Sequence, residues 1–417
     1  MDSIAKGSYM ARKAVMPLIF TLIIISMLSE SIFGQMPEAP DPGVSYAIMI
    51  DTDRGQIIYS KDPEKNFQSK LAAIIMSSIM FIEKQDRPEL LTVSSILDRA
   101  RNNELGLRVG DKHSYDDILY VMLLRSAPEL MLILADGAFT GIEAFVSLMN
   151  EKAVSLGMKN TLFTLSDNNY ISIEAATNME DMSKLMFYCL KNQKFKTMIS
   201  TKVFLWPLNE SESEIISNSN DMLWKYDYIT GGIKNTIYPI RDTTTITTAS
   251  LNNLNLLCVL ADDVTSPGDE TTDILFRFAF NNFRRGILAS KNNPVTSIEV
   301  NGIKLDLSSN TDVYYTYPIG LSFIEQLTYS IPEQIELPVM KNSPLGSANY
   351  TLSDGTVINV TLYPDRDILP KENLADKIME NLTQYKELLD IIVFLILLEV
   401  ILVLYKIISK LKKSKNQ

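Results

Sequence analysis

The stretch NFQSKLAAIIMSSIMFIEK, residues 66–84, contains the residue types that a serine nucleophile would need. In that chemistry a lysine three residues after the serine accepts its proton, because this spacing places both side chains on one helix face. The residues three positions after Ser69, Ser77 and Ser78 are instead Ala72, Met80 and Phe81. The apolar spacing of the stretch predicts a buried helix without this pair in register.

The other reactive side chains exclude several kinds of site. The single histidine, His113, lies in the polar run GDKHSYDD, where we expect a solvated turn residue, so a histidine triad or zinc site is not expected. Cys189 and Cys258 lie in apolar runs and are predicted to be core residues rather than a disulfide. We expect no metal or cofactor. The net charge of −11, without a basic stripe, argues against nucleic acid as a partner.

Both ends of the 417-residue chain predict export and membrane attachment. Residues 1–34 have a basic start, the apolar run AVMPLIFTLIIISML and a polar end, the pattern of a signal peptide or an N-terminal anchor. Residues 388–408 are apolar over enough length to cross a bilayer as one helix. The basic tail 409–417 predicts a cytoplasmic C-terminus, with the body of the protein outside the cell membrane.

The body of the chain predicts an α+β domain followed by a small all-β domain. After a proline-rich linker, residues 35–43, the segment VSYAIMIDTDRGQIIYS predicts a hairpin of two strands. Residues 44–290 then mix amphipathic helices with returning strands, which favours an antiparallel sheet covered by helices. Residues 294–367 show short strands and turns typical of a β-sandwich-like domain, and residues 368–387 link it to the membrane helix.

Several segments between residues 44 and 367 occur in the order and spacing of a known family. They are YAIMIDTDRGQIIYSKDPEKNF, LGLRVGDKHSYDDILYVMLLRSAPELMLILADG, EAFVSLMNEKAVSLGMKNTLF, GGIK and, in the β domain, IELPVMKNSPLGSANYTLSDG. Together they resemble the serine D-Ala-D-Ala carboxypeptidases of the S11 type, the low-molecular-weight penicillin-binding proteins. The resemblance implies a penicillin-binding, transpeptidase-like fold with one active-site cleft.

The resemblance also implies a first catalytic motif, S-x-x-K, at the start of the buried helix. The matching positions here are Leu71 and Ile74, so that both the nucleophile and its base are replaced by aliphatic residues. Because nucleophile and base act as a unit, their joint loss predicts that the standard acyl-enzyme mechanism is absent.

The two remaining family motifs are degraded as well. S-x-N falls on a segment that keeps the serine, Ser126, but has Pro128 in place of the amide. K-T-G falls on a segment that keeps the lysine, Lys234, followed by Asn235 and Thr236, so that a side chain occupies the place of the glycine. The resemblance thus leaves Ser126 and Lys234 as candidates for residual ligand binding and no intact catalytic set.

These losses predict a catalytically inactive relative with a binding or scaffolding role in peptidoglycan metabolism. Its partner would be a peptidoglycan stem peptide, whose carboxylate Lys234 could pair, or a cell-wall synthesis protein. The plainer expectation for Lys234 is that it points to solvent or pairs with an acid such as Asp227. Two alternatives stay open: an active serine-type carboxypeptidase with Ser126 as nucleophile and Lys234 as base, and a structural protein that recruits a membrane partner through the span containing Glu399.

Overall fold

The computed structural model describes residues 37–101, 103–167, 169–209, 211–235, 243–262, 268–291, 293–370 and 385–414. The predicted signal peptide or anchor, residues 1–34, and Thr236 lie outside the described residues. The chain divides into two compact units. The first comprises Met1–Leu288, Asp312–Gln326 and Thr351–Thr356, and the second comprises Ala289–Thr311, Leu327–Tyr350 and Val357–Gln417.

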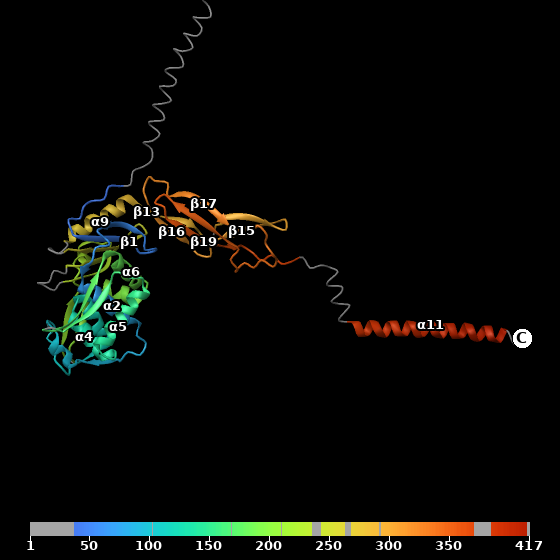
Figure 1. Ribbon diagram of the computed structural model, residues 1–417, viewed down its shortest axis with the longest axis horizontal. Coiled ribbons are helices and arrows are strands. Elements are labelled where there is room, and N and C mark those ends of the chain that lie inside the picture. The colour runs from blue at the N-terminus through green and yellow to red at the C-terminus, as the bar shows by residue number, and fades with distance from the viewer. Residues whose placement is uncertain are drawn as a thin grey trace, which may run out of the picture. The chain divides into compact units, whose positions relative to one another are not determined.

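A five-stranded antiparallel sheet is the centre of the first unit (Figure 1). In spatial order its strands are β10 (Ile229–Lys234), β11 (Thr245–Leu251), β12 (Leu254–Ala261), β1 (Tyr46–Asp51) and β2 (Ile57–Lys61). The hairpin predicted for the start of the domain is therefore confirmed as β1 and β2.

Both faces of this sheet are covered by helices. Along β1, Ile48 and Ile50 join the core cluster on one face, while Ala47 and Met49 join the cluster on the other. This explains why β1 and β12 are apolar at nearly every position instead of alternating with polar residues. The helix α9 (Asp269–Asn282) contributes to the second cluster and lies across the sheet from α2 and α6 (Figure 1).

The larger core cluster is built around a helix whose surroundings are apolar on all sides. This helix, α2 (Lys70–Glu83), has ten of its fourteen residues buried, which is the pattern of a central core helix. The other helices in the described part of this unit are α3 (Tyr115–Arg125), α4 (Pro128–Ala138), α5 (Ile142–Ser155), α6 (Met179–Cys189), α7 (Gln193–Ser200) and α8 (Met222–Lys225), with the 3-10 helix η1 (Ser95–Arg99).

The first unit also contains smaller sheets. The three-stranded sheet has the order β3 (Phe67–Gln68), β7 (Ile171–Thr177) and β6 (Leu162–Asp167). The two-stranded sheets pair β4 (Leu90–Thr92) with β5 (Lys112–Ser114), β8 (Val203–Pro207) with β9 (Ser213–Ser217), and β13 (Phe283–Ala289) with β16 (Val313–Pro318).

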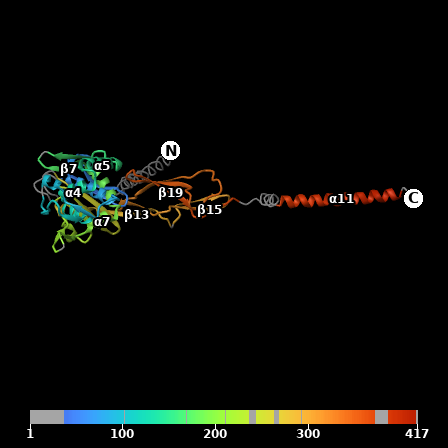
Figure 2. The same cartoon turned by 90° about the horizontal axis from the view of Figure 1, so that it is seen from below.

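A second five-stranded sheet follows, in which β15 and β19 lie side by side (Figure 2). Its order is β14 (Thr296–Val300), β15 (Ile303–Ser308), β19 (Val357–Pro364), β18 (Gly346–Leu352) and β17 (Ile324–Ser330). Alternate residues of β19 are buried, namely Ile358, Val360 and Leu362, as expected for a sheet with one face on a core.

The helix α11 (Lys386–Ser414) follows near the C-terminus. Its segment Lys386–Leu411 is long and apolar enough to cross a membrane, with a mean hydropathy of 2.9. The bent pair α4 and α5 also passes this test among the described residues, but α4 packs within the main core cluster.

The prediction for His113 was wrong. The register of β4 with β5 pairs His113 with Leu91, and its side chain is buried against the ring of Trp206, with 5.1 Å between ring centroids. Neither ring nitrogen has a hydrogen-bond partner among the described residues. In contrast, the predicted core positions of Cys189 and Cys258 are confirmed, and both are buried free thiols.

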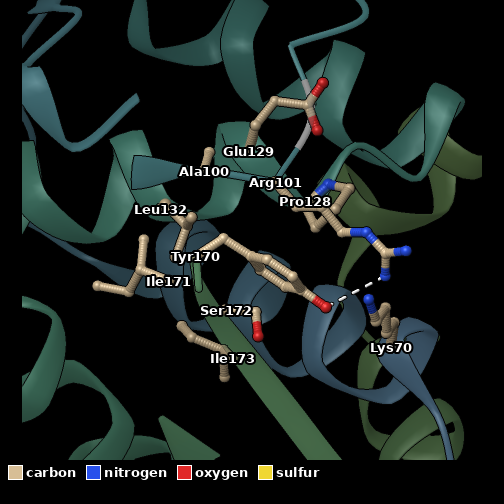
Figure 3. Close-up of a pocket in the computed structure, with 10 residues that line it drawn as sticks. All are labelled: Lys70, Ala100, Arg101, Pro128, Glu129, Leu132, Tyr170, Ile171, Ser172 and Ile173. Atoms are coloured by element: carbon tan, nitrogen blue, oxygen red, sulfur yellow. Dashed lines mark hydrogen bonds between the residues drawn. The ribbon is translucent and has the colours of Figure 1, made fainter. Parts of the chain in front are cut away.

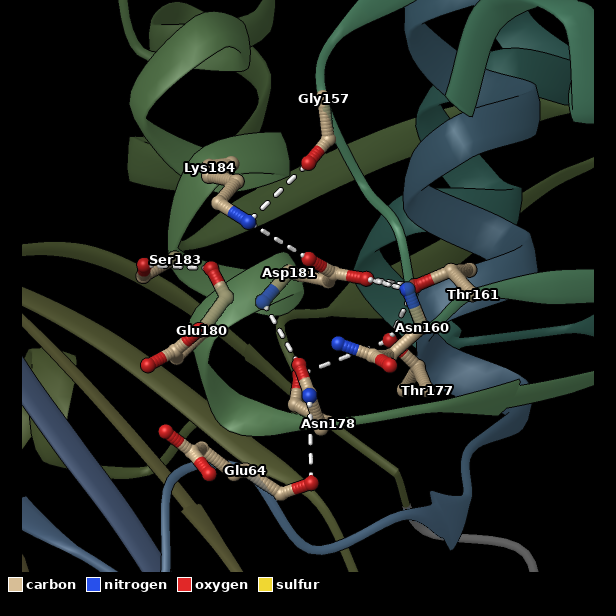
Figure 4. A network of polar contacts seen from close by, with 10 residues as sticks. All are labelled: Glu64, Gly157, Asn160, Thr161, Thr177, Asn178, Glu180, Asp181, Ser183 and Lys184. Atoms are coloured by element: carbon tan, nitrogen blue, oxygen red, sulfur yellow. Dashed lines mark hydrogen bonds and ion pairs between the residues drawn. The ribbon is translucent and has the colours of Figure 1, made fainter. Parts of the chain in front are cut away.

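A buried carboxylate fixes the position of β7, which lines the candidate site. Asp181 accepts hydrogen bonds from the backbone N–H of Asn160 (2.7 Å), from the hydroxyl of Thr161 (3.0 Å) and from the ammonium group of Lys184 (2.8 Å) (Figure 4). The side chain of Asn178 caps α6 by accepting from the N–H of Asp181 at 2.9 Å. The network ties the loop before β6 to the junction of β7 and α6.

The substitution Asp181→Ala tests this network. It removes the acceptor of the hydrogen bonds from the N–H of Asn160, the hydroxyl of Thr161 and the ammonium group of Lys184, so we expect a loss of about 2 kcal/mol in the free energy of unfolding. The measurement is urea denaturation followed by circular dichroism. The control is Asp98→Ala at an exposed position of η1, which should stay within about 0.5 kcal/mol of the wild type. Equal losses in the two variants would contradict this role.

Candidate functional site

The start of α2 carries the two positions that the sequence analysis aligned with the S-x-x-K motif. Leu71 and Ile74 are both fully buried in the main core cluster. Ser69 precedes them as the N-cap, and its Oγ accepts a hydrogen bond from the N–H of Ala72 at 3.2 Å. The same Oγ lies 3.1 Å from Oγ1 of Thr244. The serine at this helix start therefore has a structural role, and the two motif positions hold hydrocarbon.

Ser126 lies at the junction of α3 and α4. It is the C-cap of α3, in the left-handed conformation with φ 52° and ψ 45°, and it is completely buried. Its hydroxyl donates a hydrogen bond of 2.9 Å to the backbone carbonyl of Lys234. Pro128 begins α4, where its missing N–H costs nothing. The Ser126 side chain thus joins the end of α3 to the end of β10.

Lys234 is the last residue of β10. Its backbone N–H donates a hydrogen bond of 3.0 Å to Oγ of Ser219, and its ammonium group lies 3.9 Å from a carboxylate oxygen of Asp269. Asp269 also forms an ion pair with Lys225. The acid beside Lys234 is therefore Asp269, not the Asp227 suggested by the sequence.

The segments that the sequence analysis assigned to the three motifs meet at one end of the central sheet. The N–H of Asn235 donates to the carbonyl of Thr244 at 3.0 Å, and the hydroxyl of Thr244 is the one beside Ser69. Ser126 and Lys234 are joined by their own hydrogen bond. The structure therefore brings together the starts of α2 and α4 and the end of β10, while Leu71 and Ile74 are in the core.

A small pocket opens beside this convergence, and the sequence analysis did not identify it (Figure 3). Its walls come from the starts of α2 and α4, the residues after η1, and the start of β7. The lining side chains that carry charge or a hydroxyl are Lys70, Arg101, Glu129, Tyr170 and Ser172. One signal was available: Glu129 is an acidic residue at the start of the apolar run PELMLIL, which indicates a buried carboxyl group.

Glu129 is 4% exposed, and burial raises the pKa of its carboxyl group to about 7, with a further contribution from the charge of Glu104. Among the described residues no cluster of histidine, cysteine, aspartate and glutamate could hold a metal ion. The pocket therefore offers two cationic side chains, a phenol and one carboxyl group that changes its charge near neutral pH.

Solved structures with this fold are penicillin-binding proteins. Penicillin-binding protein 5 of Haemophilus influenzae superimposes with a TM-score of 0.63 at 18% identity, covering 81% of this chain and 100% of that chain. PBP3 of Streptococcus pneumoniae, described as a peptidoglycan synthesis regulatory factor, gives a TM-score of 0.62 at 13% identity and covers 78% and 99%. The chain thus has the mixed α+β penicillin-binding fold that the sequence predicted.

The sequence profile described as D-alanyl-D-alanine carboxypeptidase matches residues 34–265, more than half of the chain. The protein therefore belongs to the D-alanyl-D-alanine carboxypeptidase family. The carboxypeptidase DacF of Bacillus subtilis is 20% identical over 320 residues, 72% of this chain and 79% of the relative. A D-alanyl-D-alanine endopeptidase of Pseudomonas aeruginosa is 28% identical over 167 residues; this match covers 39% of this chain and about half, 53%, of that relative.

The buried carboxyl group predicts how stability depends on pH. Between its usual pKa of 4.5 and the raised value of about 7, the native state keeps the Glu129 proton that the unfolded state releases. The free energy of unfolding should therefore fall as pH rises through this range, by up to about 3 kcal/mol, and level off above it. Glu129→Gln removes this contribution. The melting temperature of the variant minus that of the wild type should therefore be larger at pH 8 than at pH 5.

The control for this measurement is Glu151→Gln, which neutralises an exposed carboxylate on α5. Its melting temperature should follow that of the wild type at both pH values. A Glu129→Gln variant with the same pH dependence as the wild type would show that this carboxyl group is ionised in the folded state.

Proposed function

We propose that this protein is a catalytically inactive member of its family that binds peptidoglycan stem peptides at the outer face of the cell membrane. The observation that carries the proposal is the state of the first motif, where Leu71 and Ile74 are aliphatic and fully buried. Neither a nucleophile nor a proton acceptor can act from these positions, and acyl transfer in this family needs both on one helix face.

The contacts of Ser126 also weigh against a replacement nucleophile. A serine acting in this way must present its oxygen to the substrate and its proton to a base. Here the hydroxyl is buried and donates a hydrogen bond to a backbone carbonyl. A carbonyl oxygen cannot act as the general base that removes the proton. The ammonium group of Lys234 lies 3.9 Å from a carboxylate oxygen of Asp269, whereas the Ser126 hydroxyl contacts the backbone carbonyl of Lys234.

Membrane attachment in this proposal rests on α11. Its apolar segment is sufficient for one span, and the family fold lies in the preceding residues. The basic residues after the span favour a cytoplasmic C-terminus, which would leave the family domain on the outer side of the membrane. A binding protein held there would meet stem peptides of newly made wall.

Covalent labelling tests the loss of catalysis. The full chain, solubilised in detergent, is incubated with a fluorescent penicillin and its intact mass is measured beside DacF of Bacillus subtilis as the positive control. We expect no adduct on this chain under conditions that label DacF fully. A stoichiometric adduct would overturn the proposal, and its loss in Ser126→Ala would identify Ser126 as the nucleophile.

A further inference from the structure

A second pocket lies at the other end of the central sheet from the place where the three motif segments meet. Its walls come from the turn after β1, the end of α6, helix α7 and the strands β10, β11 and β12. Thr230, near the start of β10, lines it, whereas Lys234 ends the same strand. That span of extended chain is about 13 Å long. The sheet-end pocket, as we call it, is therefore separate from Ser126, Lys234 and the aliphatic positions of α2.

Hydroxyl and amide side chains make up most of the lining of the sheet-end pocket. Eight of its fifteen lining residues carry one of these groups; Thr52 comes from the turn after β1, Thr197 and Ser200 come from α7, and Thr248 and Ser250 come from β11. The volume is about 580 Å³, which lies in the range of sites for small molecules. The pocket is thus large enough for an organic ligand and polar on several sides.

Several of these hydroxyl groups already donate their proton within the protein. Thr52 donates to the backbone carbonyl of Asn255 at 3.4 Å, and Ser250 donates to the side-chain carbonyl of Asn255 at 2.7 Å. On α7, Thr197 donates to the backbone carbonyl of Gln193 at 2.9 Å. A hydroxyl oxygen that donates keeps two lone pairs as acceptors. The lining therefore offers chiefly acceptors, and it suits a ligand that is rich in O–H donors.

The charged side chains of the lining do not favour a strongly charged ligand. The carboxylate of Asp53 forms an ion pair of 2.8 Å with Arg285, and the ammonium group of Lys191 lies 4.1 Å from the centroid of the Phe187 ring. The third charged residue, Lys196, is exposed on α7. One carboxylate against two ammonium groups leaves only a small excess of positive charge at this pocket.

Apolar side chains lie among the polar groups of the lining, namely Leu190, Ile199, Ala249 and Leu256. A sugar ring combines hydroxyl groups at its edge with C–H surfaces and carries no charge, so it matches this mixture. A peptide matches it less well, because each residue brings one backbone acceptor for every N–H donor. The chemistry of the lining therefore favours a saccharide over a peptide.

We propose that the sheet-end pocket binds a short neutral oligosaccharide. The recognition of a saccharide rests on the lining alone. The choice of an amino sugar rests on the function proposed above, because a protein that binds stem peptides also meets the sugar strand to which these peptides are attached. The amide of Gln193 and the ammonium group of Lys196 line the pocket as N–H donors for the acetyl carbonyl of such a sugar.

Titration with a defined saccharide tests the pocket. The probe is the tetramer of N-acetylglucosamine, titrated by isothermal titration calorimetry into the full chain in a detergent without a sugar head group, since a maltoside would compete. We expect saturable binding to the wild type. Ser250→Ala and Thr230→Val each remove one hydroxyl of the lining and should weaken binding by about twofold to tenfold.

A variant that fills the pocket gives the sharper result. Thr197→Trp places an indole in the lining from an exposed position of α7 and should weaken binding at least about tenfold. The matched control is Val154→Trp, which adds the same side chain on α5 at a position that is 77% exposed and outside the pocket. It should bind as the wild type does, and circular dichroism should show both variants to be folded. Thr197→Ser keeps the hydroxyl and should keep the affinity.

Two results would overturn the inference. The first is a wild type that does not bind the tetrasaccharide. The second is binding that survives Thr197→Trp, since the saccharide site would then lie elsewhere. The proposed function fails on different results, because a stem peptide titrated into the same sample and the penicillin label test it separately. Binding of the tetrasaccharide without binding of a stem peptide would support the pocket and contradict the proposed function.

Discussion

Helix α2 lies in the core of the first unit, with neighbours on every side, and this packing restricts what the rest of the site can be. The strand β7 and the helices α3, α4, α5, α6 and α7 all contact it. A helix so enclosed must bury apolar side chains on each face or find partners for every polar group. Positions 71 and 74 hold apolar side chains, leucine and isoleucine.

Aliphatic residues at positions 71 and 74 have an energetic consequence for the fold. A buried serine and lysine would need hydrogen-bond partners and compensation for the charge, whereas aliphatic residues of similar size need neither. The packing of the fold therefore does not require a serine and a lysine at these two positions. What remains at the site is a set of structural hydrogen bonds: Ser69 caps α2, Ser126 binds the carbonyl of Lys234, and Asn235 extends the sheet to Thr244.

The sequence was informative where the relevant contacts are local. The β1–β2 hairpin and the buried helix α2 follow from period-2 and period-3.6 patterns, which act over a few residues. His113 was misplaced because its burial depends on the β4–β5 register and on Trp206, about ninety positions further along. The pocket was missed for the same reason, since Lys70, Arg101 and Tyr170 meet only when α2, the segment after η1 and β7 are packed together.

Three features that work against stability lie in or next to this pocket. Ser126 adopts a left-handed conformation that a non-glycine residue enters at a cost of about 1 kcal/mol or more. Glu129 keeps a buried carboxyl group on α4, and Lys70 places a cation at the positive end of α2. Each departs from the backbone conformation or residue type that the local structure favours, whereas the apolar core around α2 agrees with it. Conflicts of this kind between local preference and the native structure are expected at functional sites.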